Sequence, residues 1–174
     1  MAFGMLADCH MPQHPTYEDG QDIRDRSFEY ACRIVGFCEA LDAGGRIGGL
    51  MVPQILSSSL SFAAMLEEAR AAESDNDFIS KCGIALKECR ESWTRLRVCH
   101  RRRLGPREEA AGLVQEGNEL ISIVTTIVKN KRRNVAAKRE AQRIAKAAAK
   151  QAQRGARQRD ASPSTHSKFQ IPNS

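Results

Sequence analysis

The segment from Leu60 to Leu86 constrains the fold of this chain more than any other stretch. It reads LSFAAMLEEARAAESDNDFISKCGIAL, in which apolar residues at helical spacing stop at a polar turn and resume with Phe78. The turn, Ser74 to Asp77, consists of residues whose side chains compete for backbone hydrogen bonds and therefore prefer caps and turns. So short a connection makes the two helices antiparallel neighbours. The sequence thus predicts an αα-hairpin at the centre of the chain.

The composition favours packed helices over sheets. Apolar residues make up 41% of the chain but aromatic residues only 5%. Strands of a sandwich or barrel need alternating runs of Val, Ile, Thr and aromatic residues, and we find no such run. The 174 residues are enough for about one domain and a tail.

Four segments have the apolar spacing of amphipathic helices. They predict an all-α fold, a four-helix bundle with a basic C-terminal helical extension. The expected helices cover residues 25–43, 50–74, 77–101 and a segment from Pro106 to Val128. Asp25 or Ser27 is expected to cap the first helix, and Pro53 should lie in the first turn of the second. In domain terms we expect a flexible leader (1–22), the bundle (23–130), the extension (131–154) and a disordered tail (155–174).

Individual side chains complete this prediction. Phe28 and Val35 are expected on the apolar face of the first helix, and Leu60 on that of the second. Glu116 and Glu119 have no matched catalytic partner, so we expect them to be solvated or paired with arginines of the bundle.

No catalytic, metal or cofactor site is apparent. The run GGRIGG, residues 44–49, follows no strand and lacks phosphate-loop spacing, so we expect a flexible interhelical loop. The six cysteines form no C-x-x-C, and five of them fall in helical patterns, where a Cys is usually a small buried hydrophobe. The N-terminal Cys9, His10 and His14 lack an ordered scaffold for a metal. We therefore expect a protein that is not an enzyme and has no cofactor.

The N-terminus lacks a basic region followed by a long apolar stretch, so no secretory signal is predicted. The most apolar window we identify, residues 110–128, carries Glu116 and Glu119 and has helical spacing instead of about 20 uninterrupted apolar residues. We expect no membrane segment and a cytoplasmic location.

The distribution of charge along the chain indicates a negatively charged binding partner. The net charge of +6 conceals an asymmetry: residues 129–159 hold 12 Lys and Arg against one acid, whereas residues 1–128 hold 14 against 19. Such a run favours phosphate contacts with RNA or DNA, without sequence specificity because no aromatic side chain interleaves it. The predicted nucleic-acid-binding residues are Arg101, Arg102, Arg103, Lys129, Lys131, Arg132, Arg133, Lys138, Arg139 and Arg143.

Two other interpretations of the basic segment remain open. It is a solvated helix face that keeps the protein soluble or docks an acidic protein partner, in which case the protein is a structural or interaction scaffold. Binding to a membrane surface fits less well, because the apolar face of the segment is thin.

The residues laid out above resemble the four-helix-bundle protein family, whose members include proteins encoded in intervening sequences of large-subunit ribosomal RNA genes. The resemblance covers about residues 24–132. It is carried by RSFEYA (26–31), VPQILSSS (52–59), LEEARAAES (66–74), DFISK (77–81), ALKE (85–88), Glu119-Leu120 and Ile127-Val128. This chain departs from the more usual N-x-x-E-G version of the motif, with Met65 and Ala69 at the outer positions. The long basic tail is not a family hallmark.

The resemblance implies an up-and-down antiparallel bundle that assembles as a homo-oligomer, often a homopentamer. Related bundles are accessory proteins of diversity-generating retroelements, with nucleic acid and a reverse transcriptase as partners. The family has no established enzymatic activity. By this resemblance the expected partners are RNA or DNA and a protein such as a reverse transcriptase.

Overall fold

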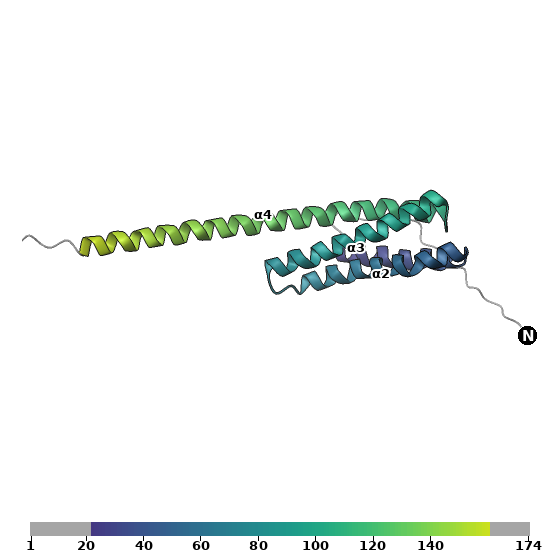
Figure 1. The fold of residues 1–174 in the computed structure, drawn as a ribbon, viewed down its shortest axis with the longest axis horizontal. Coiled ribbons are helices and arrows are strands. Elements are labelled where there is room, and N and C mark those ends of the chain that lie inside the picture. Colours follow the sequence, from purple (N-terminus) through teal and green to yellow (C-terminus); the bar gives the residue numbers. More distant parts are fainter. Residues whose placement is uncertain (1–21, 161–174) are drawn as a thin grey trace, which may run out of the picture. The chain divides into compact units, whose positions relative to one another are not determined.

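The computed structural model describes residues 22–160, and every regular element within them is an α-helix (Figure 1). The helices are α1 (Ile23–Asp42), α2 (Arg46–Arg70), α3 (Asp75–Arg102) and α4 (Arg107–Asp160). The expected all-α four-helix bundle is confirmed. By its internal packing the chain divides after Lys131. We call residues 22–131 the bundle and residues 132–160 the extension; residues 1–21 of the expected leader and 161–174 of the expected tail lie outside the described residues.

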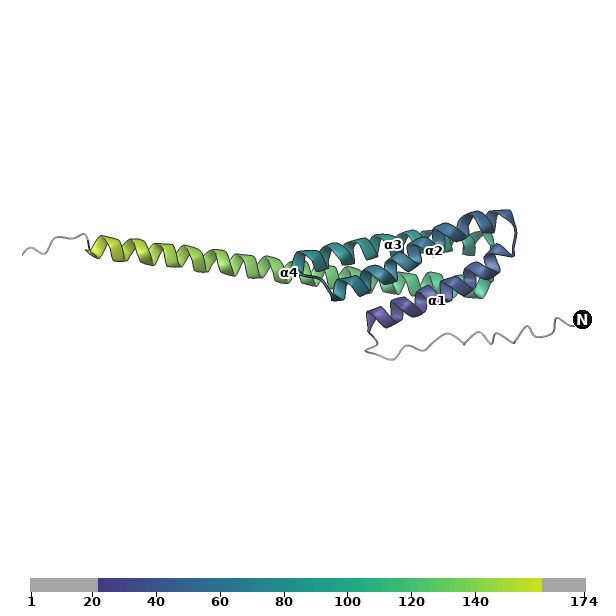
Figure 2. The ribbon, with the colours of Figure 1, turned by 90° about the horizontal axis from the view of Figure 1, so that it is seen from below.

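The central hairpin consists of α2 and α3, which lie side by side in both ribbon views (Figures 1 and 2). The turn comes three residues earlier than expected, because α2 ends at Arg70. Ser74 caps α3, since its hydroxyl accepts the Asp77 N–H at 3.1 Å, while the Asp77 carboxylate accepts the Glu73 N–H at 3.2 Å. This reciprocal pairing satisfies amide groups that the helix itself leaves unpaired.

The start of α1 also differs from the prediction. The helix begins at Ile23, and the carboxylate of Asp22 caps it by accepting the Arg24 N–H at 3.0 Å. Asp25 lies in the first turn, where its negative charge interacts favourably with the helix dipole. The expected cap at Asp25 or Ser27 is therefore wrong by a few residues.

The connection between α1 and α2 is shorter than the GGRIGG run led us to expect. Only residues 43–45 lie between the helices, so Arg46 to Gly49 are helical and the predicted loop at 44–49 is wrong. A Cβ at Gly48 would lie 2.2 Å from the Leu41 carbonyl oxygen, so this glycine allows the two helices to approach at the corner. Gly48 thus permits the close helix contact, and Gly45 adopts a φ of 114°, which a residue with a side chain rarely adopts.

Because α2 begins early, Pro53 lies inside the helix and not in its first turn. Proline has no N–H, so the Gly49 carbonyl loses the i→i−4 hydrogen bond that the helix would otherwise provide. The predictions of Pro53 in the first turn and of a loop at residues 44–49 were both wrong because α2 begins at Arg46 and not at Leu50.

The break between α3 and α4 lies between Arg102 and Arg107, within one residue of the expected helix ends at residues 101 and 106. Arg103 adopts the left-handed conformation with φ 57°, and the Leu104 N–H donates to the Cys99 carbonyl at 2.9 Å. Gly105, with φ 71°, packs against Phe37, whose ring would lie 3.0 Å from a Cβ at this position. These contacts end α3 and redirect the chain into α4.

Helix α4 is longer than predicted. It continues to Asp160, six residues past the expected end at Arg154 and through Gly155. The cost of one helical glycine, about 1 kcal/mol relative to alanine, is small beside the helix propensity of the surrounding Ala, Gln and Arg.

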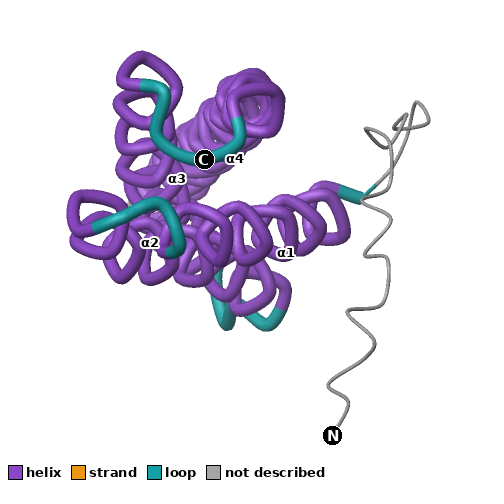
Figure 3. Tube along the Cα trace, turned by 90° about the vertical axis from the view of Figure 1, so that its right-hand side faces the viewer, coloured by secondary structure: helices purple, strands orange, loops and turns teal. Residues whose placement is uncertain are grey.

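The core of the bundle takes large side chains from all four helices, and the nearly end-on view of Figure 3 shows α2 beside both α1 and α3. It consists mainly of Tyr30, Ile34, Phe37, Leu41, Ile55, Phe62, Leu66, Cys82, Cys89, Leu96, Cys99, Leu113, Leu120 and Val124. Cys38, Cys82, Cys89 and Cys99 are buried, as predicted, whereas Cys32 is exposed. Burial raises the pKa of the Cys89 thiol to about 12 and that of Cys38 to about 11.

Three apolar residues expected on buried faces lie outside. Phe28 is 61% exposed, Val35 37% and Leu60 50%. The buried face of α1 includes Tyr30, Ala31, Ile34, Phe37, Cys38 and Leu41. Phe28 and Val35 lie at the edge of this face and are exposed. Helical periodicity defines a face but not how wide a part of it the neighbouring helices cover.

Helix α2 is, within the described residues, long and apolar enough to cross a membrane by length and composition. The more apolar window is thus in α2 and not at residues 110–128. Ile55, Phe62 and Leu66 of α2 are buried in the bundle core, and core helices commonly have this length and composition.

Candidate nucleic-acid interface

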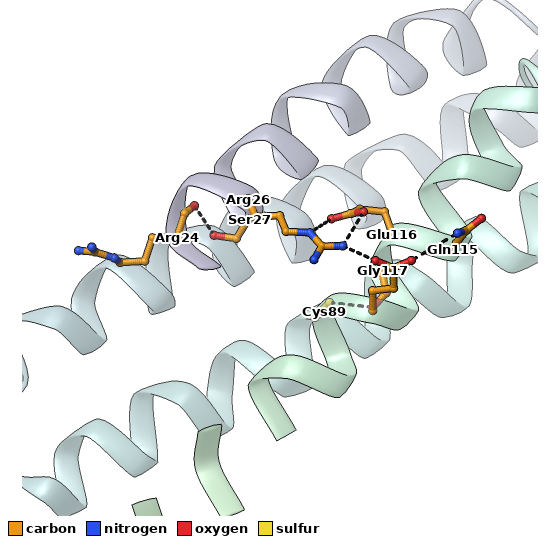
Figure 4. Close-up of polar contacts among 8 residues, drawn as sticks. Arg24, Arg26, Ser27, Cys89, Gln115, Glu116 and Gly117 are labelled. Atoms are coloured by element: carbon orange, nitrogen blue, oxygen red, sulfur yellow. Dashed lines mark hydrogen bonds and ion pairs between the residues drawn. The ribbon is translucent and has the colours of Figure 1, made fainter. Parts of the chain in front are cut away.

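Three glutamates of α4 form ion pairs with arginines of α1. The Arg26 guanidinium forms an ion pair with Glu116, in which Arg26 Nε donates to Glu116 Oε1 at 2.7 Å (Figure 4). The same guanidinium also pairs with Glu119. Glu116 is only 6% exposed, and the hydrogen bond from Arg26 lowers the pKa of Glu119 below its usual value near 4.5. Of the two expectations for these glutamates, solvation or pairing with a bundle arginine, the structure shows pairing for both.

A second ion pair repeats this link further along the same two helices. Arg33 Nε donates to Glu109 Oε1 at 3.0 Å, and both side chains are largely shielded from water. These carboxylates therefore hold helices together.

The predicted cations fall into two places. Arg101 and Arg102 end α3 and Arg103 follows it as the left-handed cap; all three are exposed. The other seven lie on α4, with Lys129 and Lys131 in the bundle and Arg132, Arg133, Lys138, Arg139 and Arg143 in the extension.

Lys131 and Arg143 each pair with a nearby carboxylate. Lys131 Nζ lies 2.7 Å from the Asp75 carboxylate and 5.3 Å from the centre of the Phe78 ring, so it ties α4 to the start of α3. Arg143 pairs with Glu140 one turn earlier, at 2.9 Å, but both side chains are exposed. An exposed pair of this kind exchanges readily for a phosphate, since it contributes less than about 1 kcal/mol.

The helix geometry of the extension gathers most of its charge on one side. Successive residues of an α-helix are rotated by about 100° about its axis, and on this spacing one set of cations falls within an arc of roughly 60° of the helix surface. We call this set the basic stripe: Arg132, Arg139, Arg143, Lys146, Lys150 and Arg157, all exposed. Lys146 and Lys150 were missed because the sequence prediction followed the density of charge and not its period, while Arg133 and Lys138 point away from the stripe. The opposite side carries Ala137, Ala141, Ile144 and Ala148.

At the carboxyl end of α3, a groove of about 530 Å³ collects a second group of cations. It brings Arg101 and Arg102 together with Arg97 and His100 from the same helix, and its apolar lining comes from Val98 and Val114. Arg97 and His100 were not predicted. The i, i+4 spacing of Arg97 and Arg101 was the signal that could have revealed them.

The outward side of α2 carries large apolar side chains, with uncharged polar residues such as Gln54 and Ser57 between them. Ile47 is 63% exposed and Leu50 69%, and Leu60 adds a third exposed side chain. No charged residue occurs between Arg46 and Glu67. We call Ile47, Leu50 and Leu60 the apolar α2 surface; such a surface is typical of an interface with another chain.

The described residues include no group of three or more His, Cys, Asp or Glu side chains placed to hold a metal ion. The features present are thus an antiparallel helical bundle, a long helix with a basic stripe, and a basic groove. They define a small helical-bundle protein with positively charged surfaces. Residues 21–126 match the family model described as 23S rRNA-intervening sequence protein, and since this is more than half of the chain, the protein belongs to that family.

A solved structure agrees with this assignment. The chain is similar to a protein of unknown function from the S23 ribosomal protein family of Bacteroides thetaiotaomicron, at 33% identity and a TM-score of 0.57, over 62% of this chain and 99% of that one. A search of curated proteins gave no match. The family match ends at residue 126, before Lys129, so the basic stripe lies beyond the matched region.

Proposed function

We propose that this protein is a non-enzymatic, self-associating helical bundle that binds RNA or DNA without sequence specificity. The observation that carries the proposal is the basic stripe, which presents six cations along one side of α4. Phosphates of one strand follow each other in a regular row, so cations aligned along a helix can contact several of them at once. The family description, which refers to 23S rRNA, is consistent with an RNA ligand.

Self-association would strengthen nucleic-acid binding, because several subunits can contact the same nucleic acid. The apolar α2 surface would leave water when two copies pack through it, and each additional subunit brings a further basic stripe to the same polyanion. Weak contacts that are individually salt-sensitive then add up. The assembly we propose is the homopentamer that the family resemblance implies.

The proposal is tested by measuring nucleic-acid affinity as a function of salt. The stripe variant is Lys146→Gln with Lys150→Gln; the control, Lys87→Gln with Lys138→Gln, removes the same charge from an exposed site on α3 and from the other side of α4. Fluorescence anisotropy with labelled RNA and DNA reports the affinity. Removal of one phosphate contact lowers the slope of log affinity against log salt by about 0.7 to 0.9.

We expect the stripe variant to lose affinity and about 1.5 units of slope, and the control to behave like the natural protein. Equal behaviour of the two variants would show that the stripe is not the binding surface. If the natural protein binds neither RNA nor DNA, yet retains one protein partner after nuclease treatment, the acidic-partner interpretation replaces this proposal.

A further inference from the structure

The groove at the carboxyl end of α3 differs chemically from the basic stripe. It is lined by Arg97, His100, Arg101 and Arg102 together with the apolar Val98 and Val114. The stripe, in contrast, offers cations without any aromatic side chain between residues 129 and 160. Cations alone hold phosphates, whereas recognition of a base needs a flat surface on which it can stack.

Such a flat surface lies at the groove. The Arg97 guanidinium lies over the Trp93 ring, with its central carbon 4.5 Å from the ring centroid. Arg97 is exposed, so the side of the guanidinium turned away from the indole faces solvent. A guanidinium plane is itself a platform on which an unstacked base can lie.

The platform is held in place from below. The Trp93 indole N–H donates to the Val114 carbonyl oxygen at 2.9 Å, which ties the ring to α4. Val114 also lines the groove. Because the indole cannot rotate without losing this bond, the guanidinium stacks on a surface of defined orientation, and less conformational entropy is lost when a ligand binds.

Cations continue along the same side of α3. Arg101 follows Arg97 by four residues, one helical turn further along, and Arg102 adjoins it. A base stacked on Arg97 would thus have positive charge within one or two turns for its own and the next phosphate.

We infer that this groove binds an unpaired nucleotide of a single-stranded RNA or DNA segment, with the base stacked on Arg97 and the phosphates on Arg101 and Arg102. The inference rests on the proposed nucleic-acid function and assigns a ligand class to one part of it. Bases within a duplex stack on each other and offer no free face to the guanidinium, so the groove discriminates single strands from duplexes.

Trp93 is the only tryptophan in the chain, so its fluorescence reports on this groove alone. The full-length protein is titrated with a single-stranded RNA of about 12 nucleotides, a length within the usual range for single-strand binding sites. In a separate titration the same strand is supplied in a duplex. Anisotropy of the labelled RNA records total binding in parallel. The variant is Arg97→Lys, which keeps the charge but not the plane; the control, Arg90→Lys, makes the same change at an exposed site elsewhere on α3.

We expect the single strand to change the Trp93 emission, and Arg97→Lys to weaken single-strand affinity by roughly fivefold or more, as the loss of one stacked base does. Duplex affinity should not change with either variant. Circular dichroism melting of both variants confirms that each is folded.

Three results would overturn the inference. If anisotropy rises while Trp93 emission stays constant, or if Arg97→Lys and Arg90→Lys bind the single strand equally well, nucleic acid binds elsewhere and the proposed function survives without this site. If anisotropy rises with neither RNA, the proposed function and the inference fail together.

Discussion

Arg26 Nε lies 2.7 Å from Glu116 Oε1, and this ion pair joins the first helix of the bundle to the last. Both side chains are largely removed from water, with 13% of Arg26 and 8% of Glu116 exposed. A pair in this position contributes little net stability over an apolar pair, but loss of one partner leaves a buried charge without compensation.

Replacement of Arg26 by Met should therefore destabilise the bundle by about 3 kcal/mol, because Glu116 would stay buried without its partner. The free energy of unfolding is measured by urea denaturation followed by circular dichroism. Glu119→Gln is the matched control: Glu119 contacts the same arginine but is 45% exposed, so its loss should cost less than about 1 kcal/mol. Similar losses in the two variants would contradict the burial argument.

Acid should weaken the same corner of the bundle. The hydrogen bond from Arg26 lowers the pKa of Glu119 in the folded state, so between the folded and unfolded pKa values the unfolded chain binds more protons. The stabilisation by Glu119 is complete above its usual pKa near 4.5 and is lost as the pH falls through the folded pKa. Urea denaturation at pH 7 and at pH 4 should show Glu119→Gln losing less stability than the natural protein, by about 0.5 kcal/mol. An identical pH dependence would rule out this contribution.

Gly48 should tolerate no side chain. A Cβ there would lie 2.2 Å from the Leu41 carbonyl oxygen, and backbone cannot move aside as a flexible side chain does. We expect Gly48→Ala to cost about 2 kcal/mol or more in thermal and urea unfolding. Gly83→Ala is the control, since nothing lies within 4 Å of its Cβ position and alanine favours a helix interior by up to about 1 kcal/mol. Destabilisation by both changes would point to a general sensitivity of the helices.

The apolar α2 surface should govern self-association. Introducing a charge by Leu50→Glu together with Leu60→Glu would make burial of this surface unfavourable, so the assembly should dissociate towards the 19.3 kDa chain. Sedimentation equilibrium measures the mass. Ile84→Glu with Val98→Glu is the control, because these residues of α3 are also about 45% exposed but lie outside the surface. A natural protein that sediments as a monomer would refute the assembly itself.

The candidate site was predicted only in part. The density of Lys and Arg after Val128 located the charged segment, and the predicted Arg101, Arg102 and Arg103 lie at the end of α3. The periodicity of helix α4, which aligns Lys146 and Lys150 with Arg132, was present in the sequence but was not used. The i, i+4 spacing of Arg97 and Arg101 is visible in the sequence, but the position of Arg97 over Trp93 and in the groove with Val114 comes from the tertiary structure.

Local sequence determined the helical class, the central hairpin, the cap at the start of α3 and the break at Gly105, because caps, turns and apolar periodicity act over a few residues. It also determined the charge asymmetry. Tertiary structure alone decided that Arg46 to Gly49 are helical, that Phe28 and Val35 face outward, and that Arg26 pairs with Glu116 across 90 positions. Each of these depends on which helices pack together and how closely, and that arrangement minimises the free energy of the whole bundle and not of any one segment.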